Sequence, residues 1–185
     1  LRSTYASHQT QSIEWRKEQI QKLLTALQNP ELVEPLLVGL YYDLHKSRFE
    51  AQMSEVDLAI HEAQFALQYL EKHALLTDED PTHENGATTI CGVRHSPYGV
   101  VLIASPWNYP VMLSLVPLVG ALACGNVALI RSGGFCKYTS NALLTFIRQV
   151  FDPSVVQIIK GSRYVTQKLL QQRFDFIFFT GGPNL

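Results

Sequence analysis

Residues 99–110 read Gly99-Val-Val-Leu-Ile-Ala-Ser-Pro-Trp-Asn-Tyr-Pro110. The first half of this stretch is an apolar run typical of a buried strand, and the second half is a loop with two prolines, a tryptophan and one side-chain amide. A second apolar stretch, 111–124, follows directly. The carboxyl end of a strand that leads into a helix is where open α/β sheets place their ligands. The stretch therefore predicts an α/β fold with a candidate site in the loop 105–110.

The rest of the carboxyl-terminal half repeats this strand-to-helix pattern. Alternation of this kind predicts right-handed crossovers and a parallel sheet with flanking helices. Gly125-Asn126 supplies a turn that ends the first helix, and Asp152-Pro153 ends the second. The predicted strands are 99–104, 126–131, 155–159 and 175–179, and the predicted helices are 110–124, 138–150 and 163–172.

Residues 1–75 read as helical. Apolar residues recur at three- and four-residue intervals in 13–27, 31–45 and 54–74, which predicts three helices that pack on a core. Pro30 fits just inside the start of the second helix, and Ser54 is a candidate N-cap for the third.

The polar stretch 77–88 is rich in turn residues and marks the best internal boundary. A short strand is predicted at 88–94. The chain is therefore divided into a helical segment (1–76), a linker and strand arm (77–97) and an α/β unit (98–185).

Composition narrows the class of protein. The chain has 185 residues, of which 46% are hydrophobic and 17% charged, as expected for a globular protein with a core. Its net charge of −1 gives no electrostatic case for a nucleic-acid partner. Cys91, Cys124 and Cys136 have neither metal-ligand nor paired spacing, so we interpret them as free structural thiols in a reducing compartment such as the cytoplasm. No metal site is predicted.

A membrane span is not predicted. Residues 95–130 contain no Asp, Glu, Lys or Arg, but four prolines and three glycines divide this stretch into short pieces. A span needs roughly 20 uninterrupted apolar residues. The chain begins at Leu1 without a signal-peptide pattern, which is consistent with an incomplete or cleaved product.

The loop 105–110 has two interpretations that its spacing does not separate. In the first, Asn108 donates a hydrogen bond to an oxyanion and Trp107 forms a wall of the site. In the second, Trp107 packs and Asn108 caps the helix that starts at Pro110.

Other candidates also follow strands. Arg131-Ser-Gly-Gly could hold a ribose or a phosphate, or could be a surface arginine and a turn. Gly161 and Thr180-Gly-Gly could allow close approach of a diphosphate, or could be ordinary turn residues. No Gly-x-Gly-x-x-Gly fingerprint follows a strand.

Together these motifs resemble the aldehyde dehydrogenase superfamily, and most closely its class-3-like, fatty-aldehyde branch. The resemblance covers residues 35–185 and continues more loosely before them. The segments that carry it are Pro97-Tyr-Gly-Val-Val-Leu-Ile, Pro106-Trp-Asn-Tyr-Pro, Pro117-Leu-Val-Gly-Ala-Leu-Ala, Gly125-Asn and Phe174-Asp-Phe-Ile-Phe-Phe-Thr-Gly.

The resemblance implies amino-terminal helices, a strand arm used in subunit association, and an incomplete Rossmann-like domain that binds NAD or NADP. It implies oxidation of an aldehyde to a carboxylic acid through a cysteine thiohemiacetal, with a glutamate as general base. Asn108 then corresponds to the oxyanion-hole amide. The implied partners are an aldehyde substrate and further copies of the chain in a homo-oligomer, which is a dimer in the related branch. The implied cofactor-binding residues are Ser105, Trp107, Arg131, Gly161, Thr180, Gly181 and Gly182.

The sequence departs from the family pattern at three places. Arg131-Ser-Gly-Gly replaces Lys-Pro-Ser-Glu, so Gly134 lacks the carboxylate that holds the adenosine ribose, and NADP is expected to be accepted. Thr180-Gly-Gly replaces Thr-Gly-Ser. The chain ends at Leu185, before the segments that carry the nucleophile and the general base.

Three functions remain open for this chain. It is the amino-terminal part of a dehydrogenase, inactive alone, or a non-catalytic relic or association module of the same fold. In the third interpretation, a helical domain is joined to a nucleotide-type α/β domain of unrelated use. The strand at 175–179 is expected to expose an apolar edge and to promote association.

Overall fold

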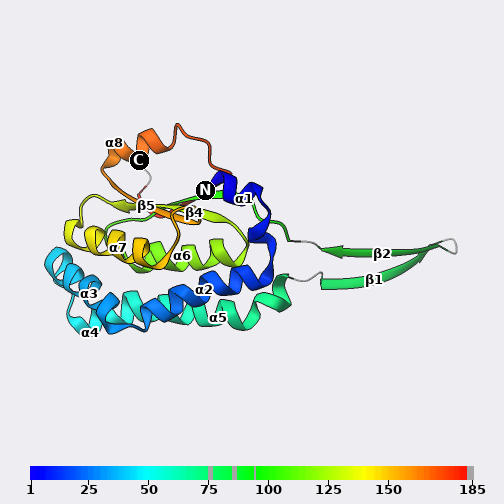
Figure 1. The fold of residues 1–185 in the computed structure, drawn as a ribbon, viewed down its shortest axis with the longest axis horizontal. Coiled ribbons are helices and arrows are strands. Elements are labelled where there is room, and N and C mark those ends of the chain that lie inside the picture. Colours follow the sequence, from blue (N-terminus) through cyan, green and yellow to red (C-terminus); the bar gives the residue numbers. More distant parts are fainter. Residues whose placement is uncertain (75–76, 85–86, 94, 183–185) are drawn as a thin grey trace.

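Helices and a parallel sheet form stacked layers in the computed structural model (Figure 1). The structure describes residues 1–74, 77–84, 87–93 and 95–182, and for residues 73–93 it describes the backbone alone. Helices α6 and α7 cover one face of the sheet, and α2, α3 and α5 form a further layer against them. Helix α8 lies on the opposite face of the sheet, on the side where α1 also lies.

Residues 1–74 are almost entirely helical, as predicted. The helices Ile13–Leu27 and Pro30–Leu44 begin at side-chain caps: Ser12 accepts from the Trp15 amide, and Asn29 accepts from the Glu31 amide next to Pro30. The elements are α1 (Arg2–Ala6), the 3₁₀ turn η1 (Gln9–Gln11), α2 (Ile13–Leu27), α3 (Pro30–Leu44), α4 (Arg48–Ala51), the π-helical turn η2 (Gln52–Val56) and α5 (Asp57–Ala74).

The predicted helix 54–74 begins earlier than expected. It is continuous with α4 and η2 from Arg48, and Ser47 is the N-cap, since its side chain accepts from the Glu50 amide. Ser54 is therefore not the cap; its hydroxyl donates to the Glu50 carbonyl inside the helix. The π turn inserts one extra residue before Asp57 and turns Glu55 inward, where it is fully buried.

A two-stranded arm projects from the body (Figure 1). Strand β1 (Thr77–Glu84) pairs antiparallel with β2 (Ala87–Val93). The prediction of a strand at 88–94 is confirmed as far as Val93, and residue 94 lies outside the described residues. The polar residues 77–84, which read as turn-rich in the sequence, instead form a strand, because pairing with β2 holds them extended despite their weak strand propensity.

The second half alternates strands and helices as predicted. Its elements are β3 (Val100–Ala104), α6 (Met112–Ala123), β4 (Val127–Gly133), α7 (Lys137–Val150), β5 (Val156–Gly161), α8 (Arg163–Leu169) and β6 (Phe176–Phe179). The four strands are parallel in the order β5-β4-β3-β6, so the chain reverses its direction of winding between β3 and β6. That reversal is a topological switch point, which is where doubly wound sheets bind ligands.

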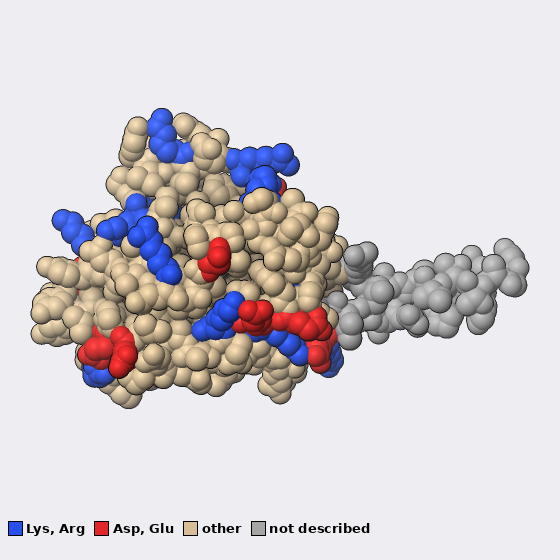
Figure 2. Space-filling model, viewed as in Figure 1, with Lys and Arg blue, Asp and Glu red and all other residues tan. Residues whose placement is uncertain are grey.

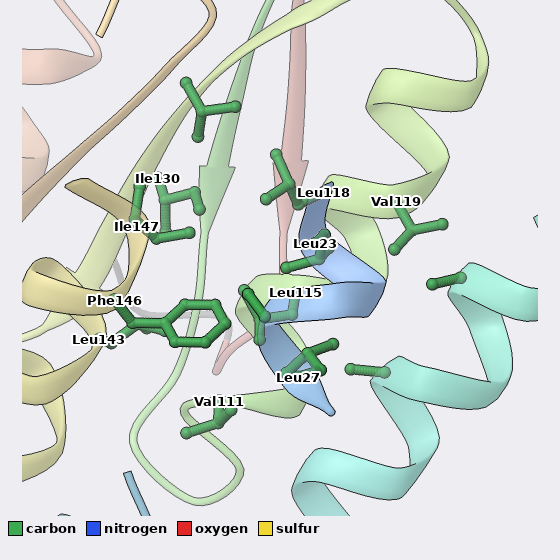
Figure 3. Close-up of a cluster of buried hydrophobic side chains, with 14 of the residues drawn as sticks. Leu23, Leu27, Val111, Leu115, Leu118, Val119, Ile130, Leu143, Phe146 and Ile147 are labelled. Atoms are coloured by element: carbon green, nitrogen blue, oxygen red, sulfur yellow. The ribbon is translucent and has the colours of Figure 1, made fainter. Parts of the chain in front are cut away.

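One continuous core joins the helical layers to the sheet (Figure 3). Leu23 from α2, Leu115 and Leu118 from α6, and Phe146 from α7 are almost completely buried in it. Because α6 lies between the sheet and the outer helices, it is buried on both sides, and this explains its apolar sequence without a membrane. No helix in the described part of the chain is long and apolar enough to cross a bilayer.

Acidic and basic side chains are interspersed on the face shown in Figure 2. Surface ion pairs join Lys17 to Glu71 and Lys22 to Glu18 on the outer helices. This mixed pattern is ordinary for a globular surface.

Candidate functional site

The loops after β3 and β6 meet at the switch point. The Thr180 amide donates to the Ala104 carbonyl at 3.1 Å, so Ser105 and Gly181 begin loops that leave the sheet side by side. These two strand ends carry the loop 105–110 and the glycines 181–182 that the sequence singled out.

The side-chain amide of Asn108 is unpartnered. Asn108 is exposed, and no described residue forms a hydrogen bond with its side chain. Its main-chain carbonyl, in contrast, accepts from Lys46 Nζ at 2.9 Å. The backbone of Asn108 is thus fixed while its amide remains available to a ligand.

Asn108 does not cap α6. That helix begins at Met112, and Glu55 Oε2 accepts from the amides of Val111 and Met112 at 2.9 and 3.0 Å. The capping interpretation of Asn108 is therefore wrong, because a carboxylate distant in the sequence takes that role.

A buried ion pair between Lys46 and Glu55 contacts the backbone of the loop 105–110. Lys46 Nζ lies 2.6 Å from Glu55 Oε1 and 3.7 Å from the centre of the Tyr109 ring. Burial raises the pKa of Glu55, although hydrogen bonds from Lys46 and from the Met112 and Val111 amides oppose that shift.

The N-terminus of α7 is capped in the same way. Asp43 Oδ2 accepts from the Thr139 amide at 2.7 Å, and Asp43 Oδ1 from the Tyr138 amide at 3.3 Å. Sequence reasoning missed Asp43, Lys46 and Glu55 as site residues, since their partners are at least nine positions away in the sequence. The one available signal was a charged pair, Asp43 and Lys46, directly at the end of an apolar helix.

Ser105 and Arg131 hold the ends of β3 and β4 together. The Ser105 hydroxyl is buried against Ser114 Oγ at 2.7 Å and the Arg131 carbonyl at 3.2 Å, and the Ser105 amide also donates to that carbonyl, so Ser105 joins the two strands from a buried position. Arg131 is half-buried and donates to the Ser105 carbonyl, while its Nε has no partner among the described residues. Burial lowers the pKa of this guanidinium.

Trp107 is 55% exposed and its ring lies 5.6 Å from that of Phe135, which follows β4. The tryptophan therefore extends the apolar wall of this edge rather than packing in the core, which was the alternative for it.

Glycines shape the remaining turns. A Cβ on Gly134 would lie 3.1 Å from the Gly161 carbonyl oxygen, so the turns after β4 and β5 are in close contact. A Cβ on Gly182 would meet nothing within 4 Å in the part of the chain that the structure describes, so there is open space beside the turn after β6.

The described cysteine side chains provide no activated nucleophile. Cys136 is buried, and its Sγ donates to the Trp107 carbonyl at 3.2 Å. Burial raises the pKa of this thiol to about 11, with a smaller contribution from Asp43, so it stays protonated. Cys124 is exposed at the end of α6, and the side chain of Cys91 lies outside the described part of the chain. Within the described residues no group of His, Cys, Asp and Glu could hold a metal ion.

Comparison with known proteins decides the family. The model of the aldehyde dehydrogenase family matches residues 2–185. The chain belongs to the aldehyde dehydrogenase family. The resemblance read from the motifs is confirmed.

Two relatives illustrate the extent of the match. Human aldehyde dehydrogenase family 3 member B1 is 39% identical over 188 residues, which cover 100% of this chain and 39% of that protein. The 4,4'-diaponeurosporen-aldehyde dehydrogenase of Staphylococcus aureus is 33% identical over 98% of this chain and 39% of that protein. This aldehyde dehydrogenase chain therefore spans about two-fifths of the length of the curated relatives it matches.

Solved structures of aldehyde dehydrogenases confirm the fold class. A substrate-bound state of Staphylococcus aureus AldH matches 96% of this chain and 38% of that chain, with a TM-score of 0.91 and 32% identity. Succinic semialdehyde dehydrogenase from Streptococcus pyogenes, solved with NADP⁺, matches with a TM-score of 0.71 and 17% identity over 89% of this chain and 35% of that chain. At that identity the second match supports the fold alone.

Proposed function

We propose that the polypeptide carrying this chain is an NAD(P)-dependent aldehyde dehydrogenase that oxidises aldehydes to carboxylic acids. Family membership supports the reaction class. One observation supports the assignment to this site: the Asn108 side-chain amide lies at the switch point and has no hydrogen-bond partner among the described residues. Glu55, and not Asn108, caps the helix that follows.

Asn108 is the proposed oxyanion donor. An exposed amide on a rigid loop can hydrogen-bond a carbonyl oxygen as negative charge develops on it. The cysteine nucleophile that forms a thiohemiacetal, and the general base, are proposed to come from residues that this chain does not contain. The protonated, buried thiol of Cys136 is consistent with that division.

The residues present fit a nicotinamide dinucleotide. The N-termini of α6 and α7 already hold the carboxylates of Glu55 and Asp43, so neither is free to bind a phosphate. The turn at Thr180-Gly181-Gly182 has open space beside Gly182 and is the proposed diphosphate site.

The other proposed contacts are with the nucleoside and the nicotinamide. Arg131 and Gly161 would face the nucleoside, Ser105 would hold Arg131 in place through its carbonyl, and Trp107 would form part of the wall. When bound, the cofactor supplies the hydride acceptor. Relatives solved with NADP⁺ and with NAD⁺ agree with this use of the fold.

The arrangement of units is proposed as well. Residues 1–76 form the helical segment, 77–97 the linker and strand arm, and 98–185 the partial cofactor-binding domain. The arm is proposed to join copies of the chain, and the protein is proposed to act in the cytoplasm on an aldehyde.

The test is a substitution in the polypeptide that the complete gene encodes. Asn108→Ala should lower kcat by about 10²–10³ in aldehyde-dependent NAD(P)H formation, since one oxyanion donor is removed. Asn141→Ala removes an exposed amide of α7 and serves as the matched control. Equal rates for the two variants would refute the role of Asn108. The purified 185-residue chain alone should show no turnover.

A non-catalytic association module is the second candidate. The four side chains of β6 are 40–45% exposed, which favours pairing of this edge with further polypeptide. A gene product of about 20.8 kDa without aldehyde-dependent activity would favour this candidate over the enzyme.

A further inference from the structure

Buried side chains from three separate segments hold the backbone of the Asn108 loop. Cys136 Sγ donates to the Trp107 carbonyl, and Lys46 Nζ donates to the Asn108 carbonyl at 2.9 Å. Glu55 accepts from the amides of Val111 and Met112. The backbone is therefore held at Trp107, at Asn108 and directly after the loop, at Val111 and Met112.

The burial of the Lys46–Glu55 pair is not explained by stability alone. Lys46 is 8% exposed and Glu55 is fully buried, and such a pair is often no better for stability than apolar residues of similar volume. Glu55 also lies on the π-helical turn η2, and such turns recur at functional sites. The pair thus needs an explanation besides stability.

We propose that Lys46 and Glu55 are positioning residues, which fix the peptide between Asn108 and Tyr109 and thereby aim the Asn108 amide. This proposal rests on the proposed function, because it assigns the pair a role in the same reaction. Lys46 contacts the carbonyl of Asn108 and the ring of Tyr109, so it holds both sides of that peptide. Glu55 forms an ion pair with Lys46 and accepts a hydrogen bond from the Val111 amide at the start of α6.

The position of the Asn108 side chain is expected to affect the reaction rate. The carbonyl carbon that Lys46 anchors through its oxygen is bonded directly to the Asn108 Cα, so a displacement of this peptide also displaces the Cα and the side chain that it bears. A displacement of about 1 Å at a reacting group can cost on the order of 10²-fold in rate. The Lys46 hydrogen bond to the Asn108 carbonyl opposes such a displacement.

A single carbonyl signal tests the local part of the proposal. Asn108-Tyr109 is the only Asn-Tyr sequence in the chain. Labelling asparagine carbonyls with ¹³C and tyrosine amides with ¹⁵N therefore gives one resonance pair, at the peptide that Lys46 contacts. In the 185-residue chain, Lys46→Met should shift and broaden this signal, and Lys46→Arg should retain much of its position. Lys22→Met, which removes an exposed ion pair with Glu18, should leave it unchanged.

A double variant separates positioning from stability. Lys46→Met alone leaves a buried carboxylate without its partner, so a lower Tm is expected. Lys46→Met combined with Glu55→Gln removes both charges and keeps an acceptor for the α6 amides. Its Tm should approach that of the unaltered chain, while the Asn108 carbonyl signal stays displaced. The proposal would be overturned if, in the double variant, the Asn108 carbonyl signal returned to its original position together with the Tm. It would also be overturned if Lys46→Met alone did not move this signal.

The catalytic part is measured on the polypeptide that the complete gene encodes. The double variant should lower kcat by about 10- to 100-fold with KM nearly unchanged, because it changes the position of the Asn108 amide relative to the reacting oxygen and leaves substrate binding intact. An unchanged kcat would overturn the catalytic part. If the unaltered polypeptide reduces no cofactor, the proposed function fails, and the carbonyl signal still decides whether Lys46 positions the peptide.

Discussion

At the scale of residues, carboxylates that act over long sequence distances define this site. Glu55 and Asp43 cap the helices that follow β3 and β4, and Glu55 leaves the Asn108 amide free. A third carboxylate, Asp175, joins the sheet to the amino terminus: it accepts from the Val100 amide at 2.8 Å and from Arg2 at 3.0 Å. These contacts connect segments more than 50 positions apart in the sequence.

Asp175 gives the fold a defined dependence on pH. The hydrogen bond from the Val100 amide, with a smaller contribution from Arg2, holds the pKa of this carboxyl below its ordinary value. A lowered folded-state pKa stabilises the fold above the unfolded pKa, and this stabilisation is lost as the pH falls through the folded-state pKa.

Asp175→Asn should therefore lower the free energy of unfolding by about 1–2 kcal/mol at neutral pH, and by less below about pH 3. Urea unfolding at the two pH values measures this. Glu18→Gln, at an exposed pair, should change stability by less than about 0.5 kcal/mol. A deficit of the same size in acid would contradict the assignment.

Gly134 is expected to influence the choice of cofactor. A carboxylate at this place would repel a 2′-phosphate, and glycine removes that repulsion. The complete polypeptide should therefore accept NADP, and Gly134→Glu should shift the ratio of the two dissociation constants towards NAD by about tenfold or more. Calorimetry with each dinucleotide measures the ratio. Gly120→Glu, where an added Cβ meets nothing within 4 Å, is the control. A strong NAD preference of the unaltered protein would contradict the prediction.

At the scale of elements, α6 organises the molecule. It follows the Asn108 loop, packs on the sheet and also contacts α2 and α5 (Figure 3). Its end is fixed by Gly125, which has a φ of 82°, and a Cβ there would lie 2.7 Å from the Thr10 carbonyl oxygen. The helix thus connects the site to the helical layers.

Loss of packing under α6 should destabilise the whole fold. Leu115 is fully buried between the sheet and the outer helices, so Leu115→Ala should lower the free energy of unfolding by about 2–5 kcal/mol. Leu170→Ala makes the same chemical change at a side chain that is 49% exposed, and should cost less than about 1 kcal/mol. Chemical denaturation of both variants measures the difference. Equal losses would mean that α6 is not central to the core.

At the scale of the whole molecule, one edge of the sheet is unprotected. Strand β6 pairs with β3 and with no other strand in the described part of the chain, and all four of its apolar side chains are exposed. Such an edge recruits further strands. The chain therefore presents an exposed apolar strand directly before the Thr180 turn.

The 185-residue chain is expected to self-associate through this edge. Light scattering over a range of concentrations should show species larger than a monomer. Ile177→Lys should reduce association, because a charge on an edge strand opposes pairing. Leu58→Lys introduces the same charge at a side chain of similar exposure on α5, and should have a smaller effect. A monodisperse monomer of the unaltered chain would contradict this expectation.

The arm shows where local sequence falls short. The residues of β1 are polar and include a proline, so they read as a boundary, and only pairing with β2 makes them a strand. The start of α4 was missed for a related reason. Ser54 has the residue type of a cap, but the π turn at Gln52–Val56 continues the helix through it.

The sequence by itself determined the alternation of strands and helices, the loop that carries Asn108, and the family, because periodicity and motifs are local properties. The strand order β5-β4-β3-β6, the meeting of the β3 and β6 loops, and the burial of Lys46 against Glu55 were decided by the tertiary structure. These features depend on which distant segments share a core, and no local pattern encodes that. For this reason Asn108 had two equal interpretations in the sequence, and the carboxylate of Glu55 excluded one of them in the fold.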